Sequence, residues 1–288
     1  MIENTLSEFG GVSRGVCETE NNTLLSIKET HELQEKDSVV IGKYDNETVY
    51  HNLGTQVAMN LIGFQKTIFK KLNNDNKTHV IVISGNGKGF SAGHNLKEVK
   101  SLKGRSKYLK LFNLCSKLMI DIVECRKPVI AKVHGSAYAA GCQLAASCDL
   151  TYCSTDAKFA TPGVNIGLFC STRMVAVSRK INRKRMMKML LTGEPINARY
   201  AKEIGLINDY YPKSKLNKKV LEVAKVISSK SNASIRIGKK AFYKQLEMPL
   251  KQAYTYTSKM MTLNMMKQDA KEGISAFLGK RSPKWKNR

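Results

Sequence analysis

The sequence predicts an α/β fold in which buried strands lead into turns of small residues and then into helices. Two stretches carry this pattern. In the first, the apolar run 80–84 leads into Gly-Asn-Gly-Lys-Gly-Phe-Ser-Ala-Gly-His-Asn-Leu at 85–96. In the second, the run 128–133 leads into Gly-Ser-Ala-Tyr-Ala-Ala-Gly-Cys-Gln-Leu at 135–144. Short apolar runs bounded by turn residues are typical of buried strands, and a helix is expected to begin near Ala140.

The remaining elements follow from apolar spacing and from cap residues. A short hairpin is expected over 38–50, around Asp45 and Asn46. Residues 157–171 are expected to form an irregular loop. Helices are predicted for 60–72, 108–123, 173–191 and 195–205, and helices dominate from there to the C-terminus. Gly193 is the expected end of the third helix, and Asn197 is the expected cap of the fourth.

The length of 288 residues is near the upper limit for a single hydrophobic core. Residues 1–36 are polar and without strong periodicity, which predicts a flexible extension. The domain is then 37–288, with a strand–helix core over 37–205 and a helical region over 206–288. The extension has no apolar segment typical of a secretory signal. Its seven glutamates and single Arg14 make it a poor mitochondrial transit peptide.

Composition narrows the class of protein further. No apolar run reaches the ~18 residues of a membrane span, so no membrane association is expected. The seven cysteines show no metal-ligand spacing, which predicts a reducing compartment, no disulfide framework and no metal site. A net charge of +25 attracts nucleic acid or phosphorylated ligands. Lysine runs over 66–71 and 213–219, with asparagines in or beside them, favour a solvated surface over RNA binding.

The two strand–turn–helix stretches resemble the fingerprints of the crotonase superfamily, also called the enoyl-CoA hydratase/isomerase family. Phe-Ser-Ala-Gly-His-Asn-Leu at 90–96 is similar to the first fingerprint, and 135–149 is similar to the second. The resemblance extends from about residue 37 to the terminal segment 273–285. It implies a crotonase, or ClpP-like, fold, which is a stacked β-β-α superhelix with a C-terminal helical trimerisation region. It also implies a homotrimer or homohexamer.

The same resemblance implies an acyl-CoA site without a permanently bound cofactor, in which a coenzyme A thioester is substrate or ligand. Two backbone amides form an oxyanion hole in this family, and in this sequence they fall on His94 and Ala140. Phe277 and Lys280 are expected to contact the nucleotide of coenzyme A. The full set of expected binding positions is Ala92, His94, Asn95, Leu96, Ala139, Ala140, Gly141, Pro162, Phe277 and Lys280.

Both carboxylates that a hydratase of this family uses are missing. Motif alignment places them at positions that are here Gln143 and Gly163. One carboxylate activates water and the other supplies a proton, and loss of either typically costs about 10²–10⁴-fold. We therefore do not expect efficient hydration of an enoyl-CoA. Ser171 stands where dienoyl-CoA isomerases have an aspartate. Asn95 replaces the usual aspartate of the first fingerprint and is expected to cap the next helix.

Three functions remain open from the sequence. The first is an acyl-CoA enzyme of fatty-acid metabolism, either decarboxylase-like or another lyase, hydratase or isomerase that stabilises an enolate. The second is a non-catalytic acyl-CoA-binding relative, and the third is a basic RNA-binding or scaffolding protein. Cys142 is expected to be a core residue, Asp149 a structural one and Glu98 a surface acid. Members that share these motifs are mitochondrial, so a mitochondrial location is implied, with the cytoplasm as the alternative.

Overall fold

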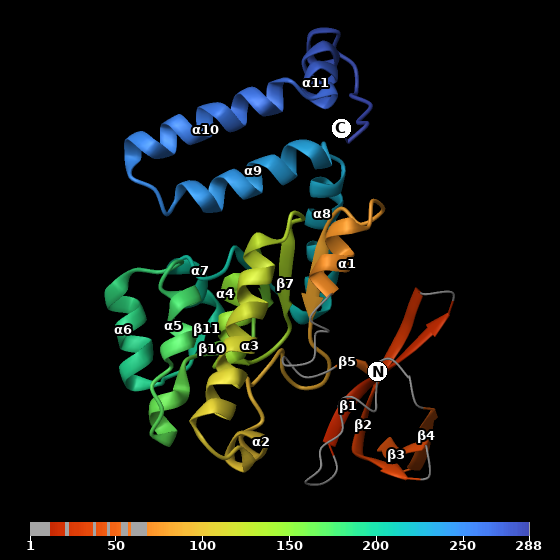
Figure 1. Cartoon of the computed structure of the whole chain (residues 1–288), viewed down its shortest axis with the longest axis vertical. Coiled ribbons are helices and arrows are strands. Elements are labelled where there is room, and N and C mark those ends of the chain that lie inside the picture. Colours follow the sequence, from red (N-terminus) through yellow and green to blue (C-terminus); the bar gives the residue numbers. More distant parts are fainter. Residues whose placement is uncertain are drawn as a thin grey trace. The chain divides into compact units, whose positions relative to one another are not determined.

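A computed structural model describes residues 12–20, 23–36, 39–44, 47–52, 57–58 and 68–287. The chain divides into two compact units. One comprises Met1–Lys66 with His94–Ser101, and the other comprises Thr67–Gly93 with Leu102–Arg288. The arrangement of the two units relative to one another is not determined (Figure 1).

The first unit contains an antiparallel sheet in the order β4-β3-β2-β1-β5. Its strands are β1 (Val12–Glu20), β2 (Thr23–Lys36), β3 (Val39–Tyr44), β4 (Glu47–Asn52) and β5 (Val57–Ala58). The expectation that 1–36 is irregular is therefore wrong for β1 and β2. These strands carry β-branched residues such as Val16 and Ile27, and their pairing uses backbone hydrogen bonds that need no apolar periodicity. The boundary at residue 37 stays a prediction.

The hairpin predicted over 38–50 is confirmed, because β3 and β4 pair antiparallel with Tyr44 opposite Glu47. Its expected turn residues, Asp45 and Asn46, lie outside the described residues. The helix predicted over 60–72 is described only from residue 68, where α1 (Ile68–Asn74) begins.

A four-stranded parallel sheet forms the centre of the second unit, in the order β12-β9-β7-β6. Its strands are β6 (Ile81–Ser84), β7 (Val129–Val133), β9 (Leu150–Ser154) and β12 (Asp209–Tyr211). The two strands expected from apolar runs are confirmed as β6 and β7. Almost all of β7 is buried, as expected for a central parallel strand. β12 lies in the range that was predicted to be helical. The sequence did not reveal this strand, because three residues are too few to show a period.

Helices cover this sheet on both sides of β7 in the view of Figure 1, with α4 on one side and α8 on the other. They include α3 (Arg105–Glu124), α4 (Ala140–Ser147) and α8 (Lys213–Ser228). Leu216 and Val220 of α8 pack against Ile130 of β7 in a buried cluster. The helices expected over 108–123 and from Ala140 are confirmed, and every residue of α4 is buried.

A second, three-stranded sheet has the order β11-β10-β8 and consists of β8 (Ala137–Tyr138), β10 (Lys158–Ala160) and β11 (Ile196–Asn197). The predicted irregular loop over 157–171 therefore contains a strand, and also the 3-10 helix η2 (Pro162–Ile166). These elements are too short to show a period in the sequence. Pairing of β10 with β8 and β11, which are distant in sequence, produces the strand.

The helix predicted over 173–191 is wrong as a single element. It is two helices, α5 (Ser171–Val177) and α6 (Arg183–Thr192). The break precedes Asn182, whose side chain accepts a hydrogen bond from the Lys184 amide and so caps a new helix. Gly193 ends α6 with φ of 64°, as predicted. Asn197 caps α7 (Ala198–Glu203), also as predicted.

Three helices complete the chain, and they are α9 (Asn232–Gln245), α10 (Leu250–Met265) and α11 (Gln268–Leu278). They confirm the predicted helical C-terminus. α9 and α10 lie side by side as a helical hairpin (Figure 1). In the part of the chain that the structure describes, no helix is both long and apolar enough to cross a bilayer.

Candidate active site

The turn between β8 and α4 holds a strained residue. Ala139 has φ of 49° and ψ of −115°, a region that residues other than glycine rarely adopt. Such conformations cost about 1–3 kcal/mol and persist only where the surroundings enforce them. Here the Ala139 amide donates to the Ala160 carbonyl oxygen at 2.9 Å, and the Ala139 carbonyl accepts the first α4 hydrogen bond from Gln143. The turn is therefore fixed from both sides.

Ala140 is the first residue of α4 and is 1% exposed. Within the described residues, its amide donates to no carbonyl oxygen. The first amides of a helix have no internal acceptor, and they lie at the positive end of the helix dipole. A buried, unpaired amide in this position can stabilise negative charge that develops on a ligand oxygen.

The two fingerprint stretches meet at backbone contact beside Ala140. The Ser91 amide donates to the Ser136 carbonyl at 3.1 Å. A Cβ on Gly141 would lie 2.2 Å from the Ser91 carbonyl oxygen, so only glycine fits there. A Cβ on Gly93, whose φ is 96°, would lie 3.0 Å from the Ala140 nitrogen. Gly93 of the first fingerprint therefore lies beside the amide that begins α4.

His94 starts the segment that belongs to the first unit. In this segment the Asn95 carboxamide oxygen accepts from the Lys97 amide at 3.0 Å and so caps α2 (Leu96–Ser101), as predicted. Glu98 of α2 accepts a hydrogen bond from the Asn95 side chain. Because the two units are not placed relative to one another, the pairing of His94 with Ala140 stays a prediction.

Gln143 lies in the middle of α4 and is 3% exposed. Its Nε2 donates to the Thr172 carbonyl oxygen at 3.1 Å, and its Oε1 accepts from the Cys115 thiol at 3.8 Å. The side chain thus joins α4 to α5 and α3. This arrangement uses one donor and one acceptor, which an amide offers and an ionised carboxylate does not.

Gly163 lies in the first turn of η2. A Cβ there would lie 2.4 Å from the Leu168 carbonyl oxygen and 2.9 Å from the Cys170 sulfur. Its φ is not in the left-handed region, so packing rather than backbone conformation demands glycine. The loop therefore leaves no space for a side chain at this position, where the fingerprint alignment predicts a carboxylate in hydratases of the family.

Cys115, Cys142 and Cys170 carry buried thiols, and the Cys170 sulfur lies beside position 163. Burial raises the pKa of Cys142 to about 12, so this thiol is neutral near pH 7. Cys142 is therefore a core residue, as predicted, and a poor nucleophile. Ser171 starts α5, and its hydroxyl donates to the Phe169 carbonyl at 3.4 Å. No group of three side chains that could hold a metal ion occurs in the described ranges.

The remaining expected binding residues lie in separate places. Pro162 begins η2, and Ala92 is exposed in the first fingerprint. Phe277 and Lys280 lie at the end of α11, and Phe277 is 83% exposed. Figure 1 shows α11 at one end of the second unit, well away from α4. The two residues therefore do not reach the Ala140 turn of their own chain.

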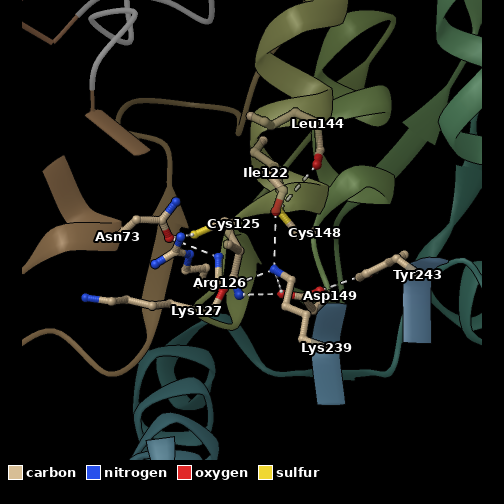
Figure 2. A network of polar contacts seen from close by, with 11 residues as sticks. Asn73, Ile122, Cys125, Arg126, Lys127, Leu144, Cys148, Asp149, Lys239 and Tyr243 are labelled. Atoms are coloured by element: carbon tan, nitrogen blue, oxygen red, sulfur yellow. Dashed lines mark hydrogen bonds and ion pairs between the residues drawn. The ribbon is translucent and has the colours of Figure 1, made fainter. Parts of the chain in front are cut away.

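A polar network lies beyond the other end of α4 (Figure 2). Asp149 Oδ2 accepts from the Val129 amide at 2.7 Å and from Lys239 Nζ at 2.6 Å, while Oδ1 accepts from the Tyr243 hydroxyl at 2.9 Å. Asp149 is thus structural, as predicted. The sequence analysis missed Lys239 of α9, because nothing in the sequence distinguishes it among the 48 lysines and arginines. Burial, and then the Asp149 charge, raise the pKa of Tyr243.

The fold and these turns define the class of protein. The family model for enoyl-CoA hydratase/isomerase matches residues 52–288, so the chain belongs to that family and has the crotonase fold. The family predicted from the two fingerprints is therefore confirmed. Among curated proteins, human "Enoyl-CoA hydratase domain-containing protein 3, mitochondrial" is 47% identical over 210 residues, which cover 73% of this chain and 69% of that protein.

Solved structures agree with this assignment. The crystal structure of human enoyl coenzyme A hydratase domain-containing protein 3 superposes with a TM-score of 0.73 at 40% identity, covering 89% of this chain and 99% of that chain. A structure described as an enoyl-CoA hydratase from Mycobacterium smegmatis gives a TM-score of 0.75 at 43% identity, covering 76% and 86%.

Proposed function

We propose that this protein binds acyl-CoA thioesters and stabilises the enolate of the acyl group through backbone amides, without a pair of carboxylates. The observation that carries this proposal is the buried Ala140 amide at the positive end of α4, which has no acceptor among the described residues. The His94 amide is the proposed second donor, by its position in the first fingerprint. Neither Gln143 nor Gly163 supplies an acid or a base beside these two amides.

The proposed binding surface follows the fingerprints. Ala139 and Gly141 keep the backbone accessible to a thioester, and the other proposed contacts are Ala92, Asn95, Leu96 and Pro162. Phe277 and Lys280 are proposed to reach the nucleotide of a coenzyme A bound to a neighbouring copy. The net charge of +25 favours a ligand that carries several phosphate charges.

Decarboxylation of a malonyl-type thioester is the reaction that this site supports best. The bond between the α-carbon and the carboxylate breaks, and CO₂ leaves. The electron pair of that bond becomes the enolate, whose oxygen the two amides hold, and the α-carbon then takes a proton from water. No general base is required, and neither Gln143 nor Gly163 repels the substrate carboxylate.

A turnover screen tests this function. Malonyl-CoA and methylmalonyl-CoA are compared with crotonyl-CoA by chromatography of the products. We expect decarboxylation of a malonyl-type substrate and no hydration of crotonyl-CoA above background. Binding without turnover of any thioester would instead identify a non-catalytic acyl-CoA-binding protein. Binding of RNA in preference to coenzyme A would contradict both assignments.

A matched pair of variants tests the amide itself. Ala140→Pro removes the N–H at the first helical position, where proline is tolerated, and Ala140→Gly retains it. A thioester-enolate analogue should bind more tightly than free coenzyme A to the unmodified protein and to Ala140→Gly. That preference should disappear in Ala140→Pro. Equal affinity for both ligands in the unmodified protein would overturn the oxyanion hole.

Assembly and location are part of the same proposal. Exposed apolar residues follow one face of α10, and they are Leu250, Tyr254, Met261 and Met265. Such a stripe favours burial against another copy, and we propose a trimer or a hexamer.

Proteins similar to this chain carry the word mitochondrial in their names, which supports a mitochondrial location.

A further inference from the structure

Lys239 of α9 is a buried cation whose hydrogen-bonding capacity is fully used. Its Nζ donates to Asp149 Oδ2 at 2.6 Å, to the Lys127 carbonyl at 3.0 Å and to the Ile122 carbonyl at 3.2 Å (Figure 2). An ammonium group has three N–H donors, and all three are engaged. The Lys239 side chain is 8% exposed. A desolvated and saturated cation of this kind permits few alternative positions for the groups that it binds.

Two of the three acceptors lie where helices end, and the third, the Lys127 carbonyl, lies in the connection between α3 and β7. Ile122 is in the last turn of α3, and Asp149 directly follows the Cys148 cap of α4. Helix C-termini carry negative partial charge, so the ammonium stabilises both ends. Asp149 also accepts from the Val129 amide, and its own amide donates to the Val129 carbonyl at 2.9 Å. The C-terminal end of α4 is therefore tied to β7 and, through Lys239, to α9.

The neighbouring groups reinforce this arrangement. The Tyr243 hydroxyl holds the second oxygen of Asp149 at 2.9 Å. Lys180, in the segment between α5 and α6, lies with its Nζ 5.5 Å from the centre of the Tyr243 ring. Burial lowers the pKa of Lys180. Two cations and a tyrosine therefore enclose one carboxylate at this end of α4.

The opposite end of α4 presents the Ala140 amide. The helix has eight residues, a length of about 12 Å, and is buried throughout, so it moves as a rigid body. We propose that Lys239 is a positioning residue for the Ala140 amide, because its contact with Asp149 fixes the rotation and translation of α4. The Ala140 amide is then correctly oriented only when Lys239 of α9 is in contact with Asp149. This inference rests on the proposed function of Ala140.

The test measures the polarisation of a bound thioester. A non-reactive acyl-CoA with a ¹³C-labelled thioester carbonyl is bound, and the carbonyl stretch is read by infrared difference spectroscopy. In the unmodified protein we expect the stretch to shift to lower frequency. Lys239→Met should lose most of this shift, and Lys239→Arg should regain part of it. The affinity of Lys239→Met for the enolate analogue relative to coenzyme A should fall on the order of tenfold.

Lys202→Met is the matched control. Lys202 of α7 donates to Asp209 of β12 at 2.7 Å, so this variant removes the same charge and an ion pair without contact to α4. It should keep the full carbonyl shift. A folded Lys239→Met protein with the full shift would overturn the role of Lys239 while leaving the function of Ala140 intact. Absence of any shift in the unmodified protein would overturn both.

A second variant covers the case in which Lys239→Met does not fold. Asp149→Asn keeps the size of the side chain and leaves Lys239 bound to the Ile122 and Lys127 carbonyls, while removing the ion pair. We expect a carbonyl shift between those of the unmodified protein and the ligand in water. A shift equal to that of the unmodified protein would overturn the proposal.

Discussion

The side-chain amide of Gln143 donates to the carbonyl oxygen of Thr172 across 3.1 Å, and this bond joins α4 to α5. An ionised carboxylate could only present a second acceptor to that carbonyl. Gln143 therefore makes a structural contact at a position where the fingerprint alignment predicts an acid in hydratases. Replacing it with the acid would remove a bond as well as add a charge.

Gln143→Glu should make stability depend on pH. Burial and the facing Thr172 carbonyl raise the pKa of the new carboxyl above its unfolded value of about 4.3. At a pH below the unfolded-state pKa, the protonated carboxyl donates to the Thr172 carbonyl, and the variant is nearly as stable as the original protein. As pH rises through the raised folded-state pKa, about 1–3 kcal/mol of stability is lost. Urea unfolding from pH 4 to 8 measures this, with Gln143→Met as the pH-independent control. A pH-independent difference for Gln143→Glu would contradict the predicted contact.

Gly163→Ala should destabilise the protein although the change is one methyl group. The methyl carbon would lie 2.4 Å from the Leu168 carbonyl oxygen, so the loop must move, at a cost of about 1–3 kcal/mol. Gly238→Ala is the control, because no atom lies within 4 Å of its new Cβ and the residue is inside α9. That change should stabilise the protein by about 0.5–1 kcal/mol. Thermal melts that show equal effects for both variants would refute the packing argument.

Hydration of crotonyl-CoA should stay near background even after both acids are restored. The double variant Gln143→Glu, Gly163→Glu introduces two carboxylates. They would not be correctly placed for catalysis, because the Leu168 carbonyl occupies the space beside position 163. We expect less than about tenfold recovery over the unmodified protein in a spectrophotometric assay, far below the ~10²–10⁴-fold that an acid contributes in a well-formed site. Robust hydration by the unmodified protein would show that another group transfers the proton.

The C-terminal tail should loosen in acid before the core unfolds. Arg281 and the Lys284 amide bind Glu272 and lower its pKa to about 2. A lowered pKa stabilises the native state above the unfolded value of about 4.3, and this contribution disappears as pH falls towards 2. The only tryptophan, Trp285, donates to the Ser229 carbonyl at 2.9 Å and reports on the tail.

The emission of Trp285 should therefore shift below pH 4 while the far-ultraviolet dichroism of the helices persists. In Glu272→Gln the shift should already be present at pH 7. Glu222→Gln, which removes an ion pair with Lys219 on α8, should leave the emission unchanged. A native emission spectrum in Glu272→Gln at pH 7 would show that the tail is held by other contacts.

Assembly should depend on the apolar face of α10. Tyr254 is 69% exposed in the single chain, and Tyr254→Lys places a charge in the middle of that face. Sedimentation velocity at micromolar concentration should show a trimer or hexamer for the original protein and smaller species for the variant. Leu221→Lys, at an exposed position of α8, is the control and should not change the sedimentation coefficient. A monomeric original protein would refute the proposed assembly.

The sequence revealed those parts of the fold that a local pattern specifies. β7 was predictable because a central parallel strand is a continuous apolar run, and α4 because glycine and alanine mark its turn. The family was predictable because its fingerprints consist of residues that backbone contact requires, such as Gly141. The division at Asn182 was not found, because basic residues continue across it from Arg173 to Lys188.

Long-range contacts were beyond the reach of the sequence. β10 becomes a strand through partners distant in the chain, and nothing local marks it. Lys239 contacts Asp149, a residue 90 positions away. The sequence predicted acid positions at Gln143 and Gly163, but it could not show what fills the space beside Gly163. The obstacle is the Leu168 carbonyl, whose place depends on the path of the whole loop.

The close approach of the Leu168 carbonyl to Gly163 also sets the order in which this loop could be redesigned. A side chain introduced at position 163 alone would meet that carbonyl, so it would be harmful before it could be useful. Substitutions that move the segment around Leu168 would have to come first, and an acid at position 163 only after them.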